Sequence, residues 1–320
     1  RNANYKAYIH RMTQALSGLE ESEKICLVHD FTCAGARMEK ARANVYTVHT
    51  PWPSLGFLKA VDAGDCALLK TGFFRQFISD ILSYDLVTLH TDRDVRNFMD
   101  LVQEIDPKAQ IDSYGRINAT INDTAHSCVV KKVHVGIDPD VILREAETAS
   151  FLPETREKFI GPISNRKAVL SVAKHDYTKG TIELGQTIDR FFEANPDQIE
   201  HVSFVVIRQS SRNGLDGQTE YQQQTDRLFQ DLRDKYGDAV IYDNKGMSHG
   251  ELMAFMRLPN VRAITALPSI REGHDLTVRE FVDVNPPDSL KAVIATKDVG
   301  AMSVLGIKDA QGKEMGAFEV

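Results

Sequence analysis

The chain has 320 residues, 42% apolar and 26% charged, a composition typical of a globular protein long enough for two domains. Its 38 Lys and Arg residues against 45 Asp and Glu residues give a net charge of −7, which argues against broad binding to nucleic acid or to an anionic membrane. No apolar run is long enough for a membrane span, and no signal-peptide pattern opens the chain. Four cysteines without metal-like spacing favour reduced thiols, so we expect a cytoplasmic protein.

Strands and helices alternate along the first half of the chain. Helical periodicity over 5–19 precedes short apolar strands at 24–28, 45–48 and 86–89, with helices at 71–83 and 93–103. The polar stretch 106–127 predicts a hairpin or loops, and a strand at 129–135 is followed by another helix. The chain opens at Arg1 rather than Met, so we expect that its natural start is missing.

The same alternation resumes in the second half. Strands are expected at 168–172, 202–207, 240–242, 262–265 and 292–295, with helices at 181–192, at 219–236 and from 248 onward. Pro153, Gly161 and Pro162 mark the intervening segment 154–166 as the junction. We therefore predict one domain over 1–158 and a second over 159–320.

Such alternation predicts an α/β fold with two Rossmann-like, doubly wound parallel sheets that face each other across one active-site cleft. Ligands bind such sheets beyond the carboxyl ends of the strands. The polar residues that come shortly after predicted strands are His29 and Asp30, His49, His90, Lys174, Arg212 and Glu272. Their shared position is the main physical argument for a single site between the domains.

The segment 171–180, SVAKHDYTKG, predicts a strand, a turn with two lysines and the start of a helix. A helix N-terminus carries partial positive charge, and Lys174 and Lys179 add two full charges, a combination that suits an anion. The plainer interpretation is an ordinary loop with solvated lysines. A second turn of the same kind, SIREGHDLTVRE at 269–280, favours the anion site.

Several common sites are not indicated. The chain has no GxGxxG or Walker motif, which argues against a dehydrogenase or a P-loop enzyme, and no Gly-x-Ser-x-Gly elbow. His29, His49, His90 and His134 lie on separate predicted strands without paired spacing, so we expect no metal site.

Seven short motifs occur in the order and spacing of one enzyme family: VHD at 28–30, HTPWPS at 49–54, YDLVTLHTDRDVRNF at 84–98, GID at 136–138, DYTKG at 176–180, SSR at 210–212 and EGHDLTVRE at 272–280. With them the chain resembles trehalose-6-phosphate synthase and its relatives, which are retaining glycosyltransferases of the GT-B fold. The resemblance runs over about 5–305, nearly the whole chain. The family's N-terminal glycine-rich strand and its C-terminal crossing helices have no counterpart here.

The resemblance implies roles for individual residues. Lys174 and Lys179 would face the diphosphate of a nucleotide-sugar donor, and Glu280 would hold its ribose. The turn formed by Glu272, Gly273, His274 and Asp275, with Leu276 after it, would contact the donor's sugar and phosphates. His49 would lie near the donor sugar, Asp30 on the acceptor sugar and Arg212 on the acceptor phosphate. We take Lys174, Lys179, His49 and Asp30 as the catalytic candidates.

Four positions depart from the family's pattern, among them His274, which stands where a methionine is usual. Lys174 stands where an arginine is usual, and Glu272 and Asp275 stand where the family has a shorter acid and an asparagine. Trehalose 6-phosphate synthesis from a nucleotide-glucose, such as UDP-glucose, and glucose 6-phosphate is the leading hypothesis. A close variant is a glucosylglycerol-phosphate synthase. The altered turn keeps two further alternatives open: a pseudo-glycosyltransferase that forms a C–N bond, and a non-catalytic regulatory homologue.

The resemblance also implies what the protein binds. The donor is a nucleotide-sugar such as UDP-glucose, used as co-substrate, and the acceptor is a small phosphorylated molecule. We expect no other cofactor, no metal, no nucleic acid and no membrane. The sequence leaves homo-oligomerisation open.

Overall fold

The computed structural model describes residues 2–17, 24–61, 69, 71–209, 216–268, 272–296, 299–302 and 317–319. The chain divides into two compact units, Arg1–Val135 and Gly136–Val320. Each unit is built on its own six-stranded sheet, which confirms the predicted α/β class. Within the described residues, none of the helices combines the length and the apolar character needed to cross a membrane.

The sheet of the first unit has the strand order β1-β2-β3-β6-β5-β4. Its parallel part consists of β1 (Ile25–His29), β2 (Ala43–Thr47), β3 (Leu86–Leu89) and β6 (Thr124–Lys132). Antiparallel strands β5 (Arg116–Ile121) and β4 (Gln110–Ile111) extend it. The polar stretch 106–127, predicted as a hairpin or loops, contributes to an antiparallel hairpin of β5 and β6, in register Ile117 with Cys128.

This sheet is accompanied by the helices α1 (Asn2–Ser17), α2 (Leu55–Val61), α3 (Gly72–Leu82) and α4 (Asp92–Ile105). α3 buries Phe74, Ile78 and Ile81, which recur at helical spacing on one face. α4 begins where the Thr91 side chain accepts a hydrogen bond from the N–H of Asp94. These apolar faces join the inward-facing strand residues in one core.

The sheet of the second unit is parallel throughout, in the order β12-β11-β10-β7-β8-β9. Its strands are β7 (Lys167–Lys174), β8 (Val202–Gln209), β9 (Val240–Asp243), β10 (Val261–Ala266), β11 (Ala292–Ala295) and β12 (Ala317–Glu319). The chain enters at β7, winds outward through β8 and β9, and returns to build β10, β11 and β12 on the other side of β7. This is the doubly wound order that the sequence predicts.

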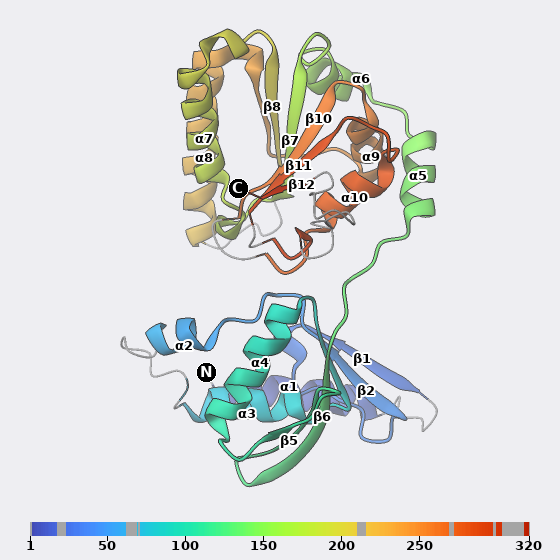
Figure 1. Ribbon diagram of the computed structural model, residues 1–320, viewed down its shortest axis with the longest axis vertical. Helices are drawn as coiled ribbons and strands as arrows, with labels where there is room; N and C mark the ends of the chain where they lie inside the picture. The colour runs from blue at the N-terminus through green and yellow to red at the C-terminus, as the bar shows by residue number, and fades with distance from the viewer. Residues whose placement is uncertain are drawn as a thin grey trace. The chain divides into compact units, whose positions relative to one another are not determined.

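Helices cover both faces of the second sheet (Figure 1). α7 (Thr181–Ala194) and α8 (Asp216–Tyr236) pack together on one face, while α5 (Pro139–Thr148), α9 (His249–Arg257) and α10 (Leu276–Val284) pack together on the other. Two apolar clusters result, one around Phe192 and Phe229 and one around Ile142 and Met253.

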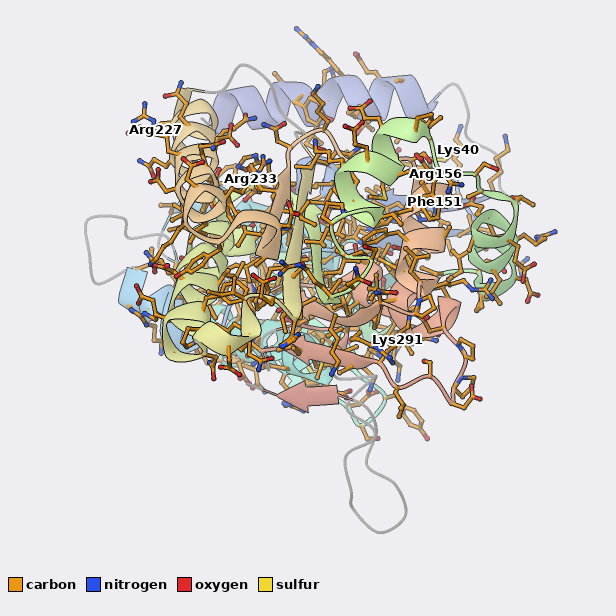
Figure 2. The ribbon with its side chains drawn as sticks, turned by 90° about the horizontal axis from the view of Figure 1, so that it is seen from above. Lys40, Phe151, Arg156, Arg227, Arg233 and Lys291 are labelled. Atoms are coloured by element: carbon orange, nitrogen blue, oxygen red, sulfur yellow. The ribbon has the colours of Figure 1, made fainter. Side chains whose placement is uncertain are left out.

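The boundary between the units differs from the one predicted at 158. Residues 151–160 belong to the second unit and include α6 (Pro153–Thr155) and one π-helical turn, η4 (Arg156–Ile160). Glu251 in α9 accepts hydrogen bonds from the N–H of Leu152 and the hydroxyl of Thr155, and Arg156 lies 5.9 Å from the centroid of the Phe151 ring (Figure 2). Pro and Gly here shape a packed turn, and the division falls instead between Val135 and Gly136.

Candidate active site

Two turns of the second unit lie where its winding reverses. β7 and β10 are parallel neighbours in the middle of the sheet. The segment after β7 leads to β8 on one side, and the segment after β10 leads to β11 on the other. In doubly wound sheets, ligands bind beyond the carboxyl ends of the two strands at this reversal. The topology thus brings both predicted anion-binding turns to one edge of one sheet.

β7 leads into a tight turn that ends at α7. The Asp176 carboxylate accepts hydrogen bonds from the N–H and the hydroxyl of Thr178, at 2.9 and 2.8 Å. Gly180 has φ 63° and ψ 32°, a left-handed conformation that glycine adopts at little cost, and Thr181 follows as the first residue of α7. The turn therefore places the partially positive N-terminus of α7 beside the end of β7.

The two lysines of this turn differ in their surroundings. Lys174, the last residue of β7, is exposed, and its side chain makes no hydrogen bond or ion pair with any described residue. Lys179 is partly buried and forms an ion pair with Glu272 of the second turn. The side chains of Lys179 and Glu272 are 24% and 20% exposed. Their ion pair links the two turns directly.

The second turn is held against residues that follow β11. Glu272 forms an isolated parallel bridge with Val299, and the N–H of Gly300 donates to the Glu272 carbonyl at 3.1 Å. A Cβ at Gly300 would lie 1.7 Å from the Gly273 carbonyl oxygen, so only glycine fits there. Gly273 is buried and His274 partly buried beside it.

Asp275 caps the helix that follows the second turn. Its side chain accepts hydrogen bonds from the N–H groups of Thr277 and Val278 at 3.0 and 3.3 Å. Burial, with the nearby charge of Glu272, raises the pKa of the Asp275 carboxyl to about 6, whereas Lys179 and the two N–H donors act in the opposite direction. This acid thus changes its charge close to neutral pH.

α10 begins at Leu276, and its second turn carries Glu280. Glu280 accepts a hydrogen bond from His249 of α9 at 3.2 Å, and the other ring nitrogen of His249 contacts Glu145 of α5 at 2.5 Å. Burial lowers the pKa of His249, but its hydrogen bonds to Glu145 and Glu280 and their charges outweigh burial and raise the pKa above its ordinary value. Glu280, the residue predicted to hold the donor ribose, is therefore oriented by His249, which the sequence analysis did not identify as a site residue.

In the first unit, Asp30 and His49 lie together beyond the ends of β1 and β2. The N–H of His49 donates to the Asp30 carboxylate at 3.0 Å, and the N–H of Asp30 donates to the Thr47 carbonyl at 2.9 Å. Asp30 has φ 60° and ψ 166°, a region that residues with a side chain rarely occupy and that costs on the order of 1–3 kcal/mol. Such strain is common at binding sites, where it fixes the direction of a functional group.

Three histidines of the first unit form a hydrogen-bonded chain. Nδ1 of His29 lies 2.9 Å from Nε2 of His49, and Nδ1 of His49 lies 3.2 Å from Nε2 of His90. Nδ1 of His90 lies 3.3 Å from the Val133 carbonyl oxygen. The rings contact one another rather than a shared point, and the described ranges contain no group of three or more His, Cys, Asp or Glu side chains placed to hold a metal ion.

The Val133 carbonyl determines which ring nitrogen donates in each of these hydrogen bonds when all three histidines are neutral. A carbonyl only accepts, so His90 donates from Nδ1 and is left with Nε2 as acceptor for His49. His49 in turn accepts at Nε2 from His29. The outermost ring, His29, is then left with an acceptor nitrogen on an exposed side chain.

The structure brings most of the predicted site residues into two groups. Lys174, Lys179 and the 272–276 turn share one edge of the second sheet, with Glu280 in the next helical turn. Asp30 and His49 share one edge of the first. Arg212 lies outside the described residues. Sequence reasoning missed His249 and Gly300, since each acts through a partner distant in sequence, whereas the strand-end positions of His29 and His90 were a usable signal.

Comparison with known proteins gives a consistent result. The family model described as Glycosyltransferase family 20 matches residues 2–307. An alpha,alpha-trehalose-phosphate synthase (UDP-forming) of Encephalitozoon cuniculi is 21% identical over 94% of this chain and 62% of its own length. The chain thus spans about three fifths of the length of that curated relative.

Solved structures show the same fold. The crystal structure of an alpha,alpha-trehalose-phosphate synthase (UDP-forming) from Burkholderia vietnamiensis matches with a TM-score of 0.81 at 22% identity, over 95% of this chain and 63% of the other. One from Burkholderia xenovorans, in complex with glucose-6-phosphate, matches with a TM-score of 0.79 at 20% identity, over 95% and 66%. These likenesses establish that the chain has the fold of those enzymes.

Proposed function

This chain belongs to glycosyltransferase family 20, and from that premise we propose that it transfers glucose with retention from UDP-glucose to glucose 6-phosphate. The relative and the structures described above are named for UDP-forming trehalose-phosphate synthesis, and one of them holds glucose-6-phosphate. Those names set the substrates that we propose for this protein.

The observation that carries the proposal is the edge of the second sheet at β7 and β10. Lys174, Lys179 and the N-terminus of α7 gather positive charge at the reversal of winding, where a doubly wound sheet binds its ligand. We infer that the donor diphosphate binds there, with Glu280 on the ribose and the 272–276 turn along the sugar and phosphates.

The proposed chemistry follows from the same charges. Negative charge grows on the diphosphate as the bond to the sugar breaks, and preorganised positive groups lower the free energy of that transition state. Lys179 and the helix N-terminus are fixed by the turn and need little reorganisation. In this family's reaction the departing phosphate helps to deprotonate the acceptor on the same face of the sugar, so we assign no carboxylate as nucleophile.

The acceptor is assigned to the first unit. The strained backbone of Asp30 holds its carboxylate against the N–H of His49, and a carboxylate is a strong acceptor for sugar hydroxyl groups. We propose that Asp30 binds the acceptor sugar, that His49 lies near the donor sugar, and that Arg212 binds the acceptor phosphate.

A second candidate function is supported by the ion pair at the turn. Glu272 neutralises Lys179, and Asp275 adds a further acid beside it. A member of the family that binds a sugar phosphate and regulates a partner, without turnover, would tolerate this arrangement better than a transferase would.

Nucleotide release tests both candidates. UDP-, ADP- and GDP-glucose are each incubated with glucose 6-phosphate, glycerol 3-phosphate or an amine acceptor, and the products are identified by NMR. The proposal predicts UDP release that depends on glucose 6-phosphate, with an α-configured product. Release with glycerol 3-phosphate alone, or with the amine alone, would assign one of the family's other reactions. Binding of glucose 6-phosphate without any release would favour the regulatory function.

We also propose a reducing, cytoplasmic setting without a metal cofactor. Cys26 and Cys128 are buried, Cys33 is partly buried, and none of the three forms a disulfide with another described cysteine. Activity that is unchanged by a chelator and by a thiol reductant would agree with this setting.

A further inference from the structure

Arg208 is a fully buried arginine in a strand whose interior is mostly apolar. It is the second-to-last residue of β8, and 1% of its surface is exposed. Its Nε donates to the Thr181 hydroxyl at 2.8 Å, and its Nη2 donates to the Ser171 hydroxyl at 3.0 Å. Its Nη1 donates to the carbonyls of Ser171 and Ile207 at 3.1 and 3.0 Å. Every one of these partners is a neutral oxygen.

No described carboxylate forms an ion pair with Arg208. Burial lowers the pKa of Arg208 to about 10, so the guanidinium still carries its charge at neutral pH. A buried charge without an opposite partner costs several kcal/mol, and an apolar side chain of similar volume would fill such a space at lower cost. The charge is therefore retained against a stability cost, which calls for an anion nearby.

The position of the guanidinium shows where that anion would bind. Ser171 lies in β7 three residues before Lys174, and Thr181 is the first residue of α7. Hydrogen bonds to both place the Arg208 charge between β7 and the N-terminus of α7, the two elements that the turn 174–180 connects. A full charge and the partial charge of a helix N-terminus, both positive, thus act on the same turn.

Asp275 is not the partner that this charge lacks. Its carboxylate is an electrostatic neighbour of Arg208, but its hydrogen bonds go to the N–H groups of Thr277 and Val278. It also stands beside a second acid, Glu272. Arg208 offsets part of this negative charge and leaves the site more attractive to a phosphate.

We propose that Arg208 is a buried positioning residue whose charge holds an anionic diphosphate at the turn 174–180 without touching it. That the anion is the diphosphate of a nucleotide-sugar rests on the proposed function. The charge acts from the interior, where salt screens little, whereas Lys174 acts from the surface.

The test compares Arg208→Met, which removes the charge, with Arg208→Lys, which keeps it but loses the planar fork. Calorimetry measures binding of uridine, UMP, UDP and inorganic pyrophosphate. We expect Arg208→Met to leave uridine binding unchanged and to weaken UDP and pyrophosphate on the order of tenfold, with UMP between them, because the effect scales with ligand charge. Arg208→Lys should stay within about threefold of the wild type, since the charge remains.

Lys174→Met is the matched control, since it removes one exposed charge from the same turn. Its effect should shrink strongly at ~0.5 M salt, whereas the effect of Arg208→Met should persist. An equal loss for uridine and UDP in Arg208→Met, or a salt dependence like that of Lys174→Met, would overturn the inference and leave a structural arginine. If Arg208→Met does not fold, Arg208→Gln replaces it. Arg208→Lys remains decisive, because lysine would not restore UDP binding if the planar guanidinium served only to hold the structure together.

A double-mutant cycle with Asp275→Asn separates a direct effect on the ligand from neutralisation of Asp275. If Arg208→Met weakens UDP binding equally in the wild-type and Asp275→Asn backgrounds, the charge acts on the ligand. If the loss vanishes with Asn at 275, Arg208 only neutralises that acid, and the inference is wrong. Failure of the proposed function can be told apart from failure of this inference. Pyrophosphate binding reports on the anion site even in a protein that transfers no glucose. A wild type that binds neither UDP nor pyrophosphate contradicts the inference itself.

Discussion

Asp275 is a helix cap and, at the same time, an acid at the edge where we place the donor diphosphate. Its pKa of about 6, raised by burial and by Glu272, means that the carboxyl is ionised at pH 7.5 and largely protonated at pH 5. An ionised carboxylate opposes a diphosphate, so UDP binding should be accompanied by proton uptake. We expect wild-type UDP affinity to fall as pH rises through about 6.

Asp275→Asn should bind UDP more tightly at pH 7.5 and lose this pH dependence, while the amide still caps α10. Protonation of Asp275 should favour the folded state as well as UDP binding, so both are expected to weaken as pH rises. A carboxyl whose pKa is raised by folding contributes stability at low pH that is lost as pH rises through about 6. Calorimetry at several pH values decides the matter, and identical pH profiles for the two proteins would show that Asp275 does not act on the ligand.

The histidine chain gives a prediction about tautomers in the first unit. Because the Val133 carbonyl only accepts, His90, His49 and His29 should each carry the proton on Nδ1 when neutral. ¹⁵N NMR of the imidazole nitrogens at alkaline pH measures this directly. In His90→Phe the partner of His49 Nδ1 is lost and His49 should populate both tautomers. A wild-type His49 protonated on Nε2 would contradict the chain.

At the scale of elements, His249 joins three helices of the second unit. Its ring connects Glu145 of α5 with Glu280 of α10, and the charged form is favoured. A histidine whose pKa is raised by folding stabilises the fold at low pH and loses that contribution as pH rises through the raised value. The His249 side chain is 50% exposed, so solvent screening limits the gain to under about 1 kcal/mol.

His249→Gln should therefore unfold at lower urea concentration than the wild type near pH 6 and at the same concentration near pH 8.5. His10→Gln is the control, because His10 is exposed in α1 and forms no hydrogen bond or ion pair with a described residue. A difference between wild type and His249→Gln that stays constant across this pH range would show that the ring's packing, rather than its charge, matters.

The elements that the sequence predicts well are those with a strong apolar pattern. The strands at β3 and β10 and the helices α3 and α7 fall within one or two residues of their expected bounds. α2 and β12 were not predicted, since seven and three residues carry too little periodic signal.

The candidate site divides in the same way. Lys179, Asp30 and His49 follow strands, and the position of a strand end is readable from sequence. Arg208 precedes the strand end and is buried, and nothing local distinguishes it from a solvated arginine. The pairing of Lys179 with Glu272 joins residues 93 positions apart, so it depends on the tertiary fold.

At the scale of the whole molecule, the division after Val135 makes α5 part of the second unit's core. Ile142 and Ala146 are buried with residues of α9 and β10, and Glu251 anchors the segment 152–155. A fragment of residues 136–320 should fold cooperatively. A fragment of residues 159–320 should be less stable by several kcal/mol, since each buried Ile or Leu contributes about 1.5–3 kcal/mol.

Circular dichroism and urea unfolding of the two fragments measure the difference. The predicted domain start at 159 was based on Pro153, Gly161 and Pro162, which also occur in packed turns. Equal stability of the two fragments would restore that boundary and would mean that α5 contributes nothing to the second unit.

The central claim is that the turn between β7 and α7 binds the diphosphate of the donor. The most direct test is turnover of UDP-glucose and glucose 6-phosphate by Lys179→Ala, beside Lys167→Ala as a control at the opposite end of the same strand. Lys167 is exposed, so the control removes one lysine of β7 far from the turn. We predict that Lys179→Ala lowers kcat ~10²–10³-fold, the usual cost of removing a group that stabilises developing charge, while Lys167→Ala keeps the wild-type rate. Wild-type rate and donor affinity in Lys179→Ala would contradict the claim, and the turn would then be an ordinary connection between a strand and a helix.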